Sequence, residues 1–374
     1  MCIRDSFWVL QRTPDTFPSY LNDIAQSMME YVADISRERV RFRAGGYAPT
    51  QPVEAPRGSK DAFYIKIDKH YGSSDHVTYM QHGIPAVMFI TWPDMWYYSS
   101  EDTFDKQDPT QYKRAAAVGL GGLAVISTGT DEMAARVVSD NLGRGLSRMG
   151  ESHTKGLGYM ADATPQTLSQ AYKEARVAIL HQAGVEKGVV KSASVLWTNT
   201  AEGQKRTAAF EPLIDQRASA LLNEVRAAYQ LQAMQRGTQT AEPTMTAEEK
   251  EAANLIVQSV GGAGAGGGRG GGAGAGGGRG GGAGAAGAGA VQPPAAARGG
   301  GGGGGRGGGA AAGPSLPQEV NAEFSILLGK NLTALEIRDF ISGEFTPVPL
   351  ADVMAVLRAR EAAGTIKLVP KTVK

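Results

Sequence analysis

The chain has 374 residues, and its 38 Lys and Arg side chains nearly balance 37 Asp and Glu, for a net charge of +1. This balance argues against a protein that binds nucleic acid along its whole length, because such proteins carry a basic surface. The single cysteine, Cys2, excludes disulfides within the chain and cysteine-rich zinc modules. We expect no membrane partner, because the sequence contains no run of 18 apolar residues.

Residues 1–6 (MCIRDS) have the pattern of neither a secretory signal nor a helix start, and we interpret them as an artefactual or disordered start. The run FWVL follows at once and is typical of a β-strand with no element before it. We therefore expect the chain to begin part-way through a domain, with a genuine short N-terminus as the alternative. The compartment stays open, and export of a longer parent protein is one option.

Residues 7–129 have the pattern of an α/β domain. Strands are expected at 7–11 and 62–67, and the apolar run 84–91 predicts a third strand that is buried on both faces. Apolar residues at helical spacing predict a helix over 18–35. Strand, loop and helix in this order favour an α/β layer with a mainly parallel sheet.

Capping residues predict two further helices in this region. Ser74 is a candidate N-cap of a short helix that ends before Gly83, which suits the left-handed position after a helix. Asp108 and Pro109 begin a helix that extends to about Ser127. Ligands bind beyond the carboxyl ends of parallel strands, so we expect the loop 92–108 to lie at that edge, and the turn before the short helix as well if the strand before it is parallel.

Residues 130–258 are predicted to be helical. Thr164 and Pro165 begin one helix, which Gly184 can end, and 208–236 carries an apolar stripe without a sustained heptad. We interpret His153 and His181 as surface or packing residues, since neither has a second ligand at metal-binding spacing.

Residues 259–317 are rich in Gly, Ala and Arg, and the decapeptide GGAGAGGGRG occurs twice in succession. Such a segment buries too little apolar surface to offset the entropy of ordering, so we expect a disordered linker. Its four arginines suggest RNA contact as an alternative, but the segment has no aromatic residue for base stacking. Nucleic acid is therefore a disfavoured partner.

Residues 318–374 predict a small helical module that resembles a minimal winged helix. Thr333 and Glu336 form a capping box, a second helix covers 350–363, and a short strand follows at 365–369. The module has seven basic and seven acidic side chains, so it lacks the positive charge that dominates DNA affinity. A role in packing or protein contact is favoured.

Three motifs follow one another within 30 residues: Ser74-Asp75-His76, then Gly83-Ile84-Pro85-Ala86, then the segment 97–103 (YYSSEDT). In order and approximate spacing they resemble the co-catalytic zinc exopeptidases of the bacterial leucyl aminopeptidase type. The resemblance covers about 7–129 and implies part of a three-layer α/β/α domain that hydrolyses peptide bonds with two zinc ions. It also implies that most zinc ligands and the glutamate base precede residue 7, and that Tyr98 stands where the family has a histidine ligand.

The site-lining candidates are Asp75, His76, Tyr98 and Asp102, and we predict no retained catalytic residue and no zinc bound by this chain. Tyr98 has three interpretations: a zinc-bound phenolate, a hydrogen-bond donor to a developing oxyanion, or packing in an aromatic loop. Asp75 and His76 either line the site or cap a helix and bind backbone, while Asp102 is expected to hold its loop by accepting backbone hydrogen bonds.

His70 and His82 are expected at the surface. A peptide is the expected substrate of the longer parent. The alternative is a metal-free interaction protein on the same fold, as the transferrin receptor is within this superfamily.

Overall fold

The computed structural model describes residues 7–42, 53–72, 74–94, 96–97, 99–260 and 314–371. The fold is mixed α/β and mostly helical, and it divides into two compact units. Unit 1 contains residues 1–70, 85–244 and 342–344, and unit 2 contains 71–84, 245–341 and 345–374. The predicted disordered start and residues 261–313 of the predicted linker lie outside the described residues. No helix in the described ranges is long and apolar enough to cross a membrane.

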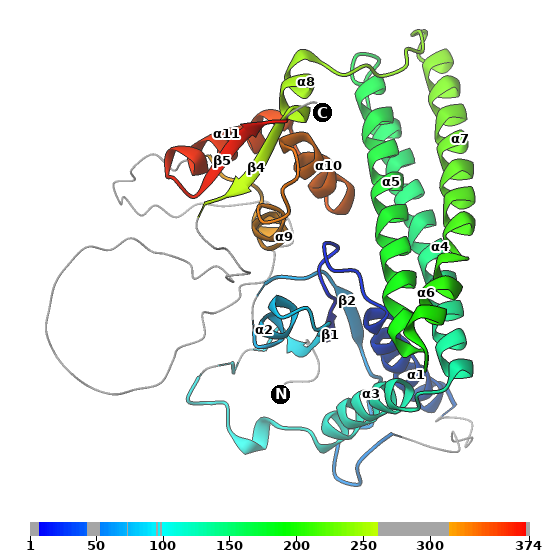
Figure 1. Cartoon of the computed structure of the whole chain (residues 1–374). Helices are drawn as coiled ribbons and strands as arrows, with labels where there is room; N and C mark the ends of the chain where they lie inside the picture. Colours follow the sequence, from blue (N-terminus) through cyan, green and yellow to red (C-terminus); the bar gives the residue numbers. More distant parts are fainter. Residues whose placement is uncertain are drawn as a thin grey trace, which may run out of the picture. The chain divides into compact units, whose positions relative to one another are not determined.

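Unit 1 contains a three-stranded sheet in the order β2-β1-β3 (Figure 1). Strand β1 (Phe7–Gln11) is parallel to β2 (Ile65–Asp68) and antiparallel to β3 (Met88–Trp92). The expected α/β layer is present, but the expectation of a mainly parallel sheet is wrong for β3. The first two strands are joined by the helix α1 (Leu21–Phe42), as a parallel crossover requires.

The third strand also differs from its prediction in length and burial. It begins at Met88 rather than at 84, and all five of its residues are half-buried instead of covered on both faces. Ile84 is 53% exposed. Pro85 has no N–H to donate to a neighbouring strand, and β3 lies at the edge of the sheet, which together explain the shorter pairing.

Helix α1 and helix α3 (Pro109–Ser127) pack on this sheet. Their shared core includes Trp8 and Leu10 of β1, Met29 of α1 and Val118 of α3. The predicted start of α3 is confirmed, because the Asp108 carboxylate accepts a hydrogen bond from the backbone N–H of Thr110 and Pro109 occupies the first turn. A one-turn 3-10 helix, Phe104–Lys106, precedes it.

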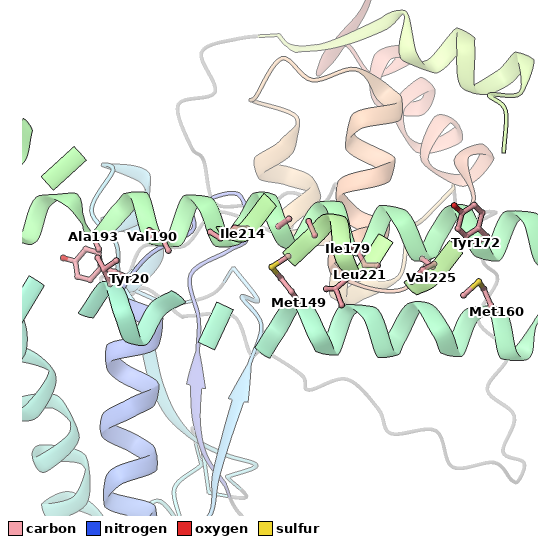
Figure 2. Close-up of a cluster of buried hydrophobic side chains, with 14 of the residues drawn as sticks. Tyr20, Met149, Met160, Tyr172, Ile179, Val190, Ala193, Ile214, Leu221 and Val225 are labelled. Carbon is pink, nitrogen blue, oxygen red and sulfur yellow. The ribbon is translucent and has the colours of Figure 1, made fainter. Parts of the chain in front are cut away.

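The rest of unit 1 is helical, as predicted. It contains α4 (Asp131–Asp162), α5 (Leu168–Ser192), a 3-10 turn at Ala193–Leu196, α6 (Thr200–Ala208) and α7 (Glu211–Gln235). Figure 2 shows side chains from these helices meeting in one apolar cluster, among them Met149, Ile179 and Leu221. The expectation that Gly184 ends a helix is wrong: α5 continues to Ser192, and burial of Val189 and Val190 stabilises its last turns.

A glycine permits the close approach of α4 and α5. A Cβ placed on Gly156 would lie 2.8 Å from the Cβ of Ala175. Because this separation is shorter than carbon–carbon contact allows, a side chain here would push the helices apart. Gly158, two residues along α4, has nothing within 4 Å of such a Cβ.

Unit 2 contains α2 (His76–Gln81), α8 (Ala247–Ala253), a 3-10 turn at Gln318–Val320, α9 (Asn321–Leu327), α11 (Leu350–Ala362) and all but the last three residues of α10 (Ala334–Glu344). Its hairpin pairs β4 (Leu255–Ser259) antiparallel with β5 (Ile366–Pro370). The capping box of Thr333 and Glu336 is confirmed. Strand β4 falls within the segment predicted to be helical, and the apolar, β-branched pair Ile256-Val257 suits a strand that pairs with β5.

The start of α2 corrects one capping prediction. The N-cap position belongs to Asp75, whose side chain makes no capping hydrogen bond, while Ser74 has a φ of 90° and does not cap the helix. Gly83 follows the helix with a φ of 75°, and its N–H bonds to the carbonyl of Met80. The predicted left-handed position after the helix is therefore confirmed.

Candidate functional site

The sequence-predicted site residues have different surroundings. Asp75 is exposed and His76 is buried, and both belong to unit 2, whereas Asp102 is exposed on a loop of unit 1. Tyr98 lies outside the described residues. Burial lowers the pKa of His76, while the neighbouring carboxylate of Asp75 raises it in opposition. This shift favours the neutral imidazole near pH 7.

The loop 92–108 leaves the sheet at the amino-terminal end of β1, and not at the carboxyl end as expected. Because β3 is antiparallel to β1, its last residue, Trp92, pairs with Phe7, the first residue of β1. The last residue of β2, Asp68, pairs instead with Gln11 at the other end of β1. The loop and the turn after β2 therefore begin at opposite edges, and the expectation of a shared carboxyl edge is wrong.

Within that loop, carboxylates other than Asp102 hold the backbone and its neighbours. Asp94 accepts a hydrogen bond from the N–H of Trp96, at 3.0 Å, and Asp105 binds the hydroxyl of Thr103 and the ammonium of Lys106. The side chain of Asp102 accepts no hydrogen bond from any residue that the structure describes. Within the described part of the loop, Asp94 rather than Asp102 accepts a backbone hydrogen bond with its side chain.

A pocket of about 450 Å³ lies at the carboxyl ends of the two parallel strands. Arg12 and Thr13 follow β1 directly, Lys69 and His70 follow β2, and α4 contributes a row of polar side chains: Arg144, Ser147, Arg148 and Glu151. His70 is 3% exposed, so the prediction of a surface position is wrong, whereas His82 is exposed as expected. This edge of the sheet is the place where α/β proteins bind ligands.

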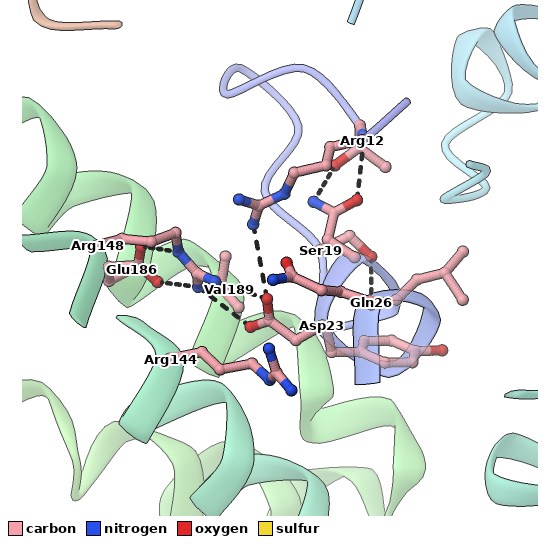
Figure 3. Close-up of polar contacts among 12 residues, drawn as sticks. Arg12, Ser19, Asp23, Gln26, Arg144, Arg148, Glu186 and Val189 are labelled. Atoms are coloured by element: carbon pink, nitrogen blue, oxygen red, sulfur yellow. Dashed lines mark hydrogen bonds and ion pairs between the residues drawn. The ribbon is translucent and has the colours of Figure 1, made fainter. Parts of the chain in front are cut away.

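A buried ionic network includes Arg12 and Arg148 of the pocket wall (Figure 3). The guanidinium of Arg148 binds both oxygens of Asp23, at 2.7 and 3.1 Å, and both oxygens of Glu186, at 2.7 Å each. The carboxylates of Asp23 and Glu186 are almost completely buried. Burial alone would lower the pKa of Arg148, but hydrogen bonds and charge attraction from Glu186 and Asp23 raise it above its ordinary value. The cation is therefore permanent, and together with Arg12 it balances the two carboxylates drawn from α1 and α5.

Arg12 is a second cation beside this network. Its Nη2 atom lies 3.6 Å from Oδ1 of Asp23, too long for a hydrogen bond, and its guanidinium donates no hydrogen bond within the described residues. Burial and the nearby charge of Arg148 lower the pKa of Arg12, against the opposing attraction of Asp23. Arg12 thus lines the pocket as the second cation of this network, ion-paired with Asp23.

Unit 1 contains one group of three potential metal ligands among the described residues: Asp15, His181 and Glu344, whose ligand atoms lie within 4.8 Å of one another. His181 Nε2 lies 3.0 Å from Asp15, and the ammonium of Lys69 lies 3.6 Å from Asp15 and 3.3 Å from Glu344. Burial would raise the pKa of Asp15, but Lys69 and His181 hold it well below its usual range.

The ammonium of Lys69 already pairs with both carboxylates, and the group does not include the motif residues Asp75, His76 or Asp102. A two-zinc centre needs ligands that converge on metals about 3.5–4 Å apart. The described residues therefore do not fit the zinc pair that the motif resemblance implies.

Sequence reasoning missed Arg12, Asp23, Arg148 and Glu186. Helical periodicity could have identified three of them, because Asp23, Arg148 and Glu186 lie on the buried faces of their helices. Comparisons with models of protein families, with curated proteins and with solved structures found no match for this chain.

Proposed function

We propose that this chain forms the C-terminal part of a zinc-dependent exopeptidase domain of the bacterial leucyl aminopeptidase type, which hydrolyses peptide bonds at a chain end. The observation that carries the proposal is the ordered set of three motifs, at 74–76, 83–86 and 97–103. The last motif lies between β3 and α3, in a strand–loop–helix arrangement that suits a site-forming loop.

The sheet of unit 1 supports this proposal. Among the described residues, β2 and β3 each pair with β1 alone, so one side of each strand presents unpaired backbone groups. Helix α3 exposes Tyr112, Leu120 and Leu123, each by about 60% (59%, 65% and 60%). Open strand edges and exposed apolar helix faces are covered in most complete domains. Further strands and helices of a larger α/β/α domain would cover them.

In this proposal the remaining part of the domain supplies most of the zinc ligands and the glutamate base. The donor set of the described residues does not fit a zinc pair, as set out above, and Tyr98 replaces the histidine of the resembling family. These same two observations favour a second candidate, a metal-free interaction protein on the same fold.

The two candidates are separated by expressing the longer protein encoded by the upstream reading frame. The exopeptidase proposal predicts about two zinc ions per chain and chelator-sensitive cleavage of aminoacyl-4-nitroanilides. A longer protein that binds no zinc and cleaves no substrate would exclude the exopeptidase and favour the interaction protein.

Two variants of the longer protein test the role of Tyr98. Tyr98→His should tighten zinc binding, because neutral imidazole ligates without the deprotonation that a phenol requires near pH 7. Tyr98→Phe retains the aromatic ring and removes the hydroxyl. Unchanged activity in Tyr98→Phe would assign Tyr98 to packing, and a loss of kcat would assign it to hydrogen bonding or ligation.

A further inference from the structure

Helix α7 has a second apolar stripe, which is exposed. Its buried face, with Ile214, Leu221 and Val225, packs into the core of the helical part (Figure 2). Leu213 and Leu231 are about five full turns apart and therefore lie on the same side of the helix. They are 47% and 50% exposed. Single exposed leucines need no explanation, whereas a contiguous apolar stripe marks an interaction site.

The stripe continues between these leucines at the spacing of a helix–helix contact. Positions 213, 217, 220, 224, 227, 231 and 234 follow one another at intervals of four and three residues, which keeps them on one side of a helix. Met234, at the end of the stripe, is 70% exposed. Ala220, Glu224 and Ala227 are exposed, and Arg217 is half-buried. Because two charged residues interrupt the apolar ones, hydrophobic periodicity alone does not reveal this stripe.

The two charged residues of the stripe have no strong partner in their own chain. Arg217 forms no ion pair or hydrogen bond with any residue that the structure describes. Glu224 has one ion-pair partner there, His153 of α4 at 3.4 Å, which is charged only when protonated. Arg217 and Glu224 are about 10.5 Å apart along the helix, too far to pair with each other. The stripe therefore presents one positive and one negative group to a partner.

The stripe is complementary to itself in antiparallel orientation. Positions equally far from residue 222 pair Leu213 with Leu231, Arg217 with Ala227 and Ala220 with Glu224. Each long charged side chain thus faces an alanine, which leaves room for Arg217 of one chain to reach Glu224 of the other. A parallel arrangement would instead set each charged residue against its own copy, and like charges in contact are unfavourable.

We propose that this stripe of α7 binds the same stripe of a second copy of the chain, in antiparallel orientation, and forms a two-fold symmetric dimer. Leu213 and Leu231 form the apolar contacts at its two ends, and Arg217 and Glu224 form two ion pairs across its centre. A second copy fits because a two-fold interface requires a surface that is complementary to itself. The inference does not depend on the exopeptidase proposal, because α7 lies outside the segment that resembles those enzymes.

Sedimentation velocity of the 374-residue chain over a range of concentrations tests the proposal. We expect a monomer–dimer equilibrium. Leu213→Glu and Leu231→Glu should each weaken the dimer by about tenfold or more, because a charge then faces a leucine at both ends. Leu180→Glu, at a leucine of α5 that is 52% exposed and lies outside the stripe, is the matched control and should change nothing.

These three leucines are about half-exposed, so circular dichroism should show an unchanged fold in each variant. A parent chain that stays monomeric at every concentration would overturn the proposal. So would a dimer that survives both α7 variants, or one that Leu180→Glu weakens as much as they do.

Charge reversal tests the ion pairs. Arg217→Glu and Glu224→Arg should each weaken the dimer by about tenfold or more, because each sets like charges opposite one another twice. The double variant exchanges the two charges and should recover most of the parental affinity. Parental affinity in both single variants, or a double variant as weak as the single ones, would rule out the contact between Arg217 and Glu224.

Cross-linking tests the orientation. In a Cys2→Ser background, chains with Leu213→Cys and chains with Leu231→Cys should form a disulfide when they are mixed. Neither variant should do so alone, because the two copies of each position lie about 27 Å apart in the antiparallel dimer. Disulfides formed by either variant alone, in place of the mixed one, would contradict the proposal.

Discussion

The helical part and the sheet of unit 1 differ in how completely their apolar faces are covered. In the helical part, α4, α5 and α7 enclose a continuous core in which Met149, Ile179 and Leu221 are fully buried. In the sheet, β1 is buried, but β2 and β3 are at best half-buried along their length. The difference indicates that one part is closed by its own helices, whereas the other offers edges on which further elements could pack.

The largest effect on stability is expected from Arg148→Met in the helical part of unit 1. The change leaves the carboxylates of Asp23 and Glu186 buried without their cation, and we expect a loss of about 3–5 kcal/mol in the free energy of unfolding. Arg144→Met is the matched control on the same helix, because its partners Glu30 and Asp140 are 38% and 48% exposed. Urea denaturation measures both, and equal costs would mean that the buried network is not what stabilises this region.

The next largest change in stability is expected where α4 packs closely on α5. Gly156→Ala places a methyl group 2.8 Å from the Cβ of Ala175, and overpacking of this kind costs about 1–3 kcal/mol. Gly158→Ala makes the same chemical change on the same helix where space is open, so a gain of up to about 1 kcal/mol is expected from helix propensity. Thermal unfolding should give opposite signs, and two changes of the same sign would contradict the tight contact.

A pH effect is expected from Lys155 of α4. Burial and the nearby charge of Lys69 lower the pKa of Lys155 to about 8, against about 10.4 in an unfolded chain. Between these values the unfolded state binds more protons, so stability should rise as the pH rises from about 8 to 10. The rise should stop near pH 10, where Tyr159, whose pKa burial raises to about 12, begins to favour the unfolded state. Unfolding curves of Lys155→Gln should lack the rise, and a parent chain whose stability falls over this range would refute the assignment.

The smallest effect on stability is expected at exposed positions of α3. Leu120→Ser and Leu123→Ser alter side chains of α3 that are already exposed, so each should change the stability of this chain by less than about 0.5 kcal/mol. Val118→Ala, at a buried position of the same helix, should cost more. In the longer protein that the proposed function predicts, the two leucines should become costly to replace, because the added elements would cover them. Equal, small costs in both proteins would mean that α3 faces solvent in each.

Local signals in the sequence predicted the helix ends. Asp108 with Pro109, Thr333 with Glu336 and Gly83 act through contacts within a few residues, so the chain itself contains the information. The direction of β3 and the pairing of β4 with β5 depend on partners far along the chain. Hydrophobic patterns do not specify such partners, which is why both were missed.

Only the approximate position of the candidate pocket, beyond the carboxyl ends of parallel strands, was predictable from the sequence. Parallel pairing of β1 and β2 gives a carboxyl edge, and ligand sites were expected there. Arg148 contacts Asp23 across 125 residues and Glu186 across 38. No spacing rule links positions so far apart, so the network could not be inferred from composition or motifs.

The proposed function implies that most ligands of the zinc pair of the resembling exopeptidases lie outside this chain. Plasma mass spectrometry of the purified 374-residue protein, together with an assay on aminoacyl-4-nitroanilides, tests this claim most directly. We predict less than one zinc ion per chain and no cleavage that a chelator suppresses, because too few ligands converge to replace the water around two metal ions. A stoichiometry near two zinc ions, with chelator-sensitive cleavage, would contradict the claim.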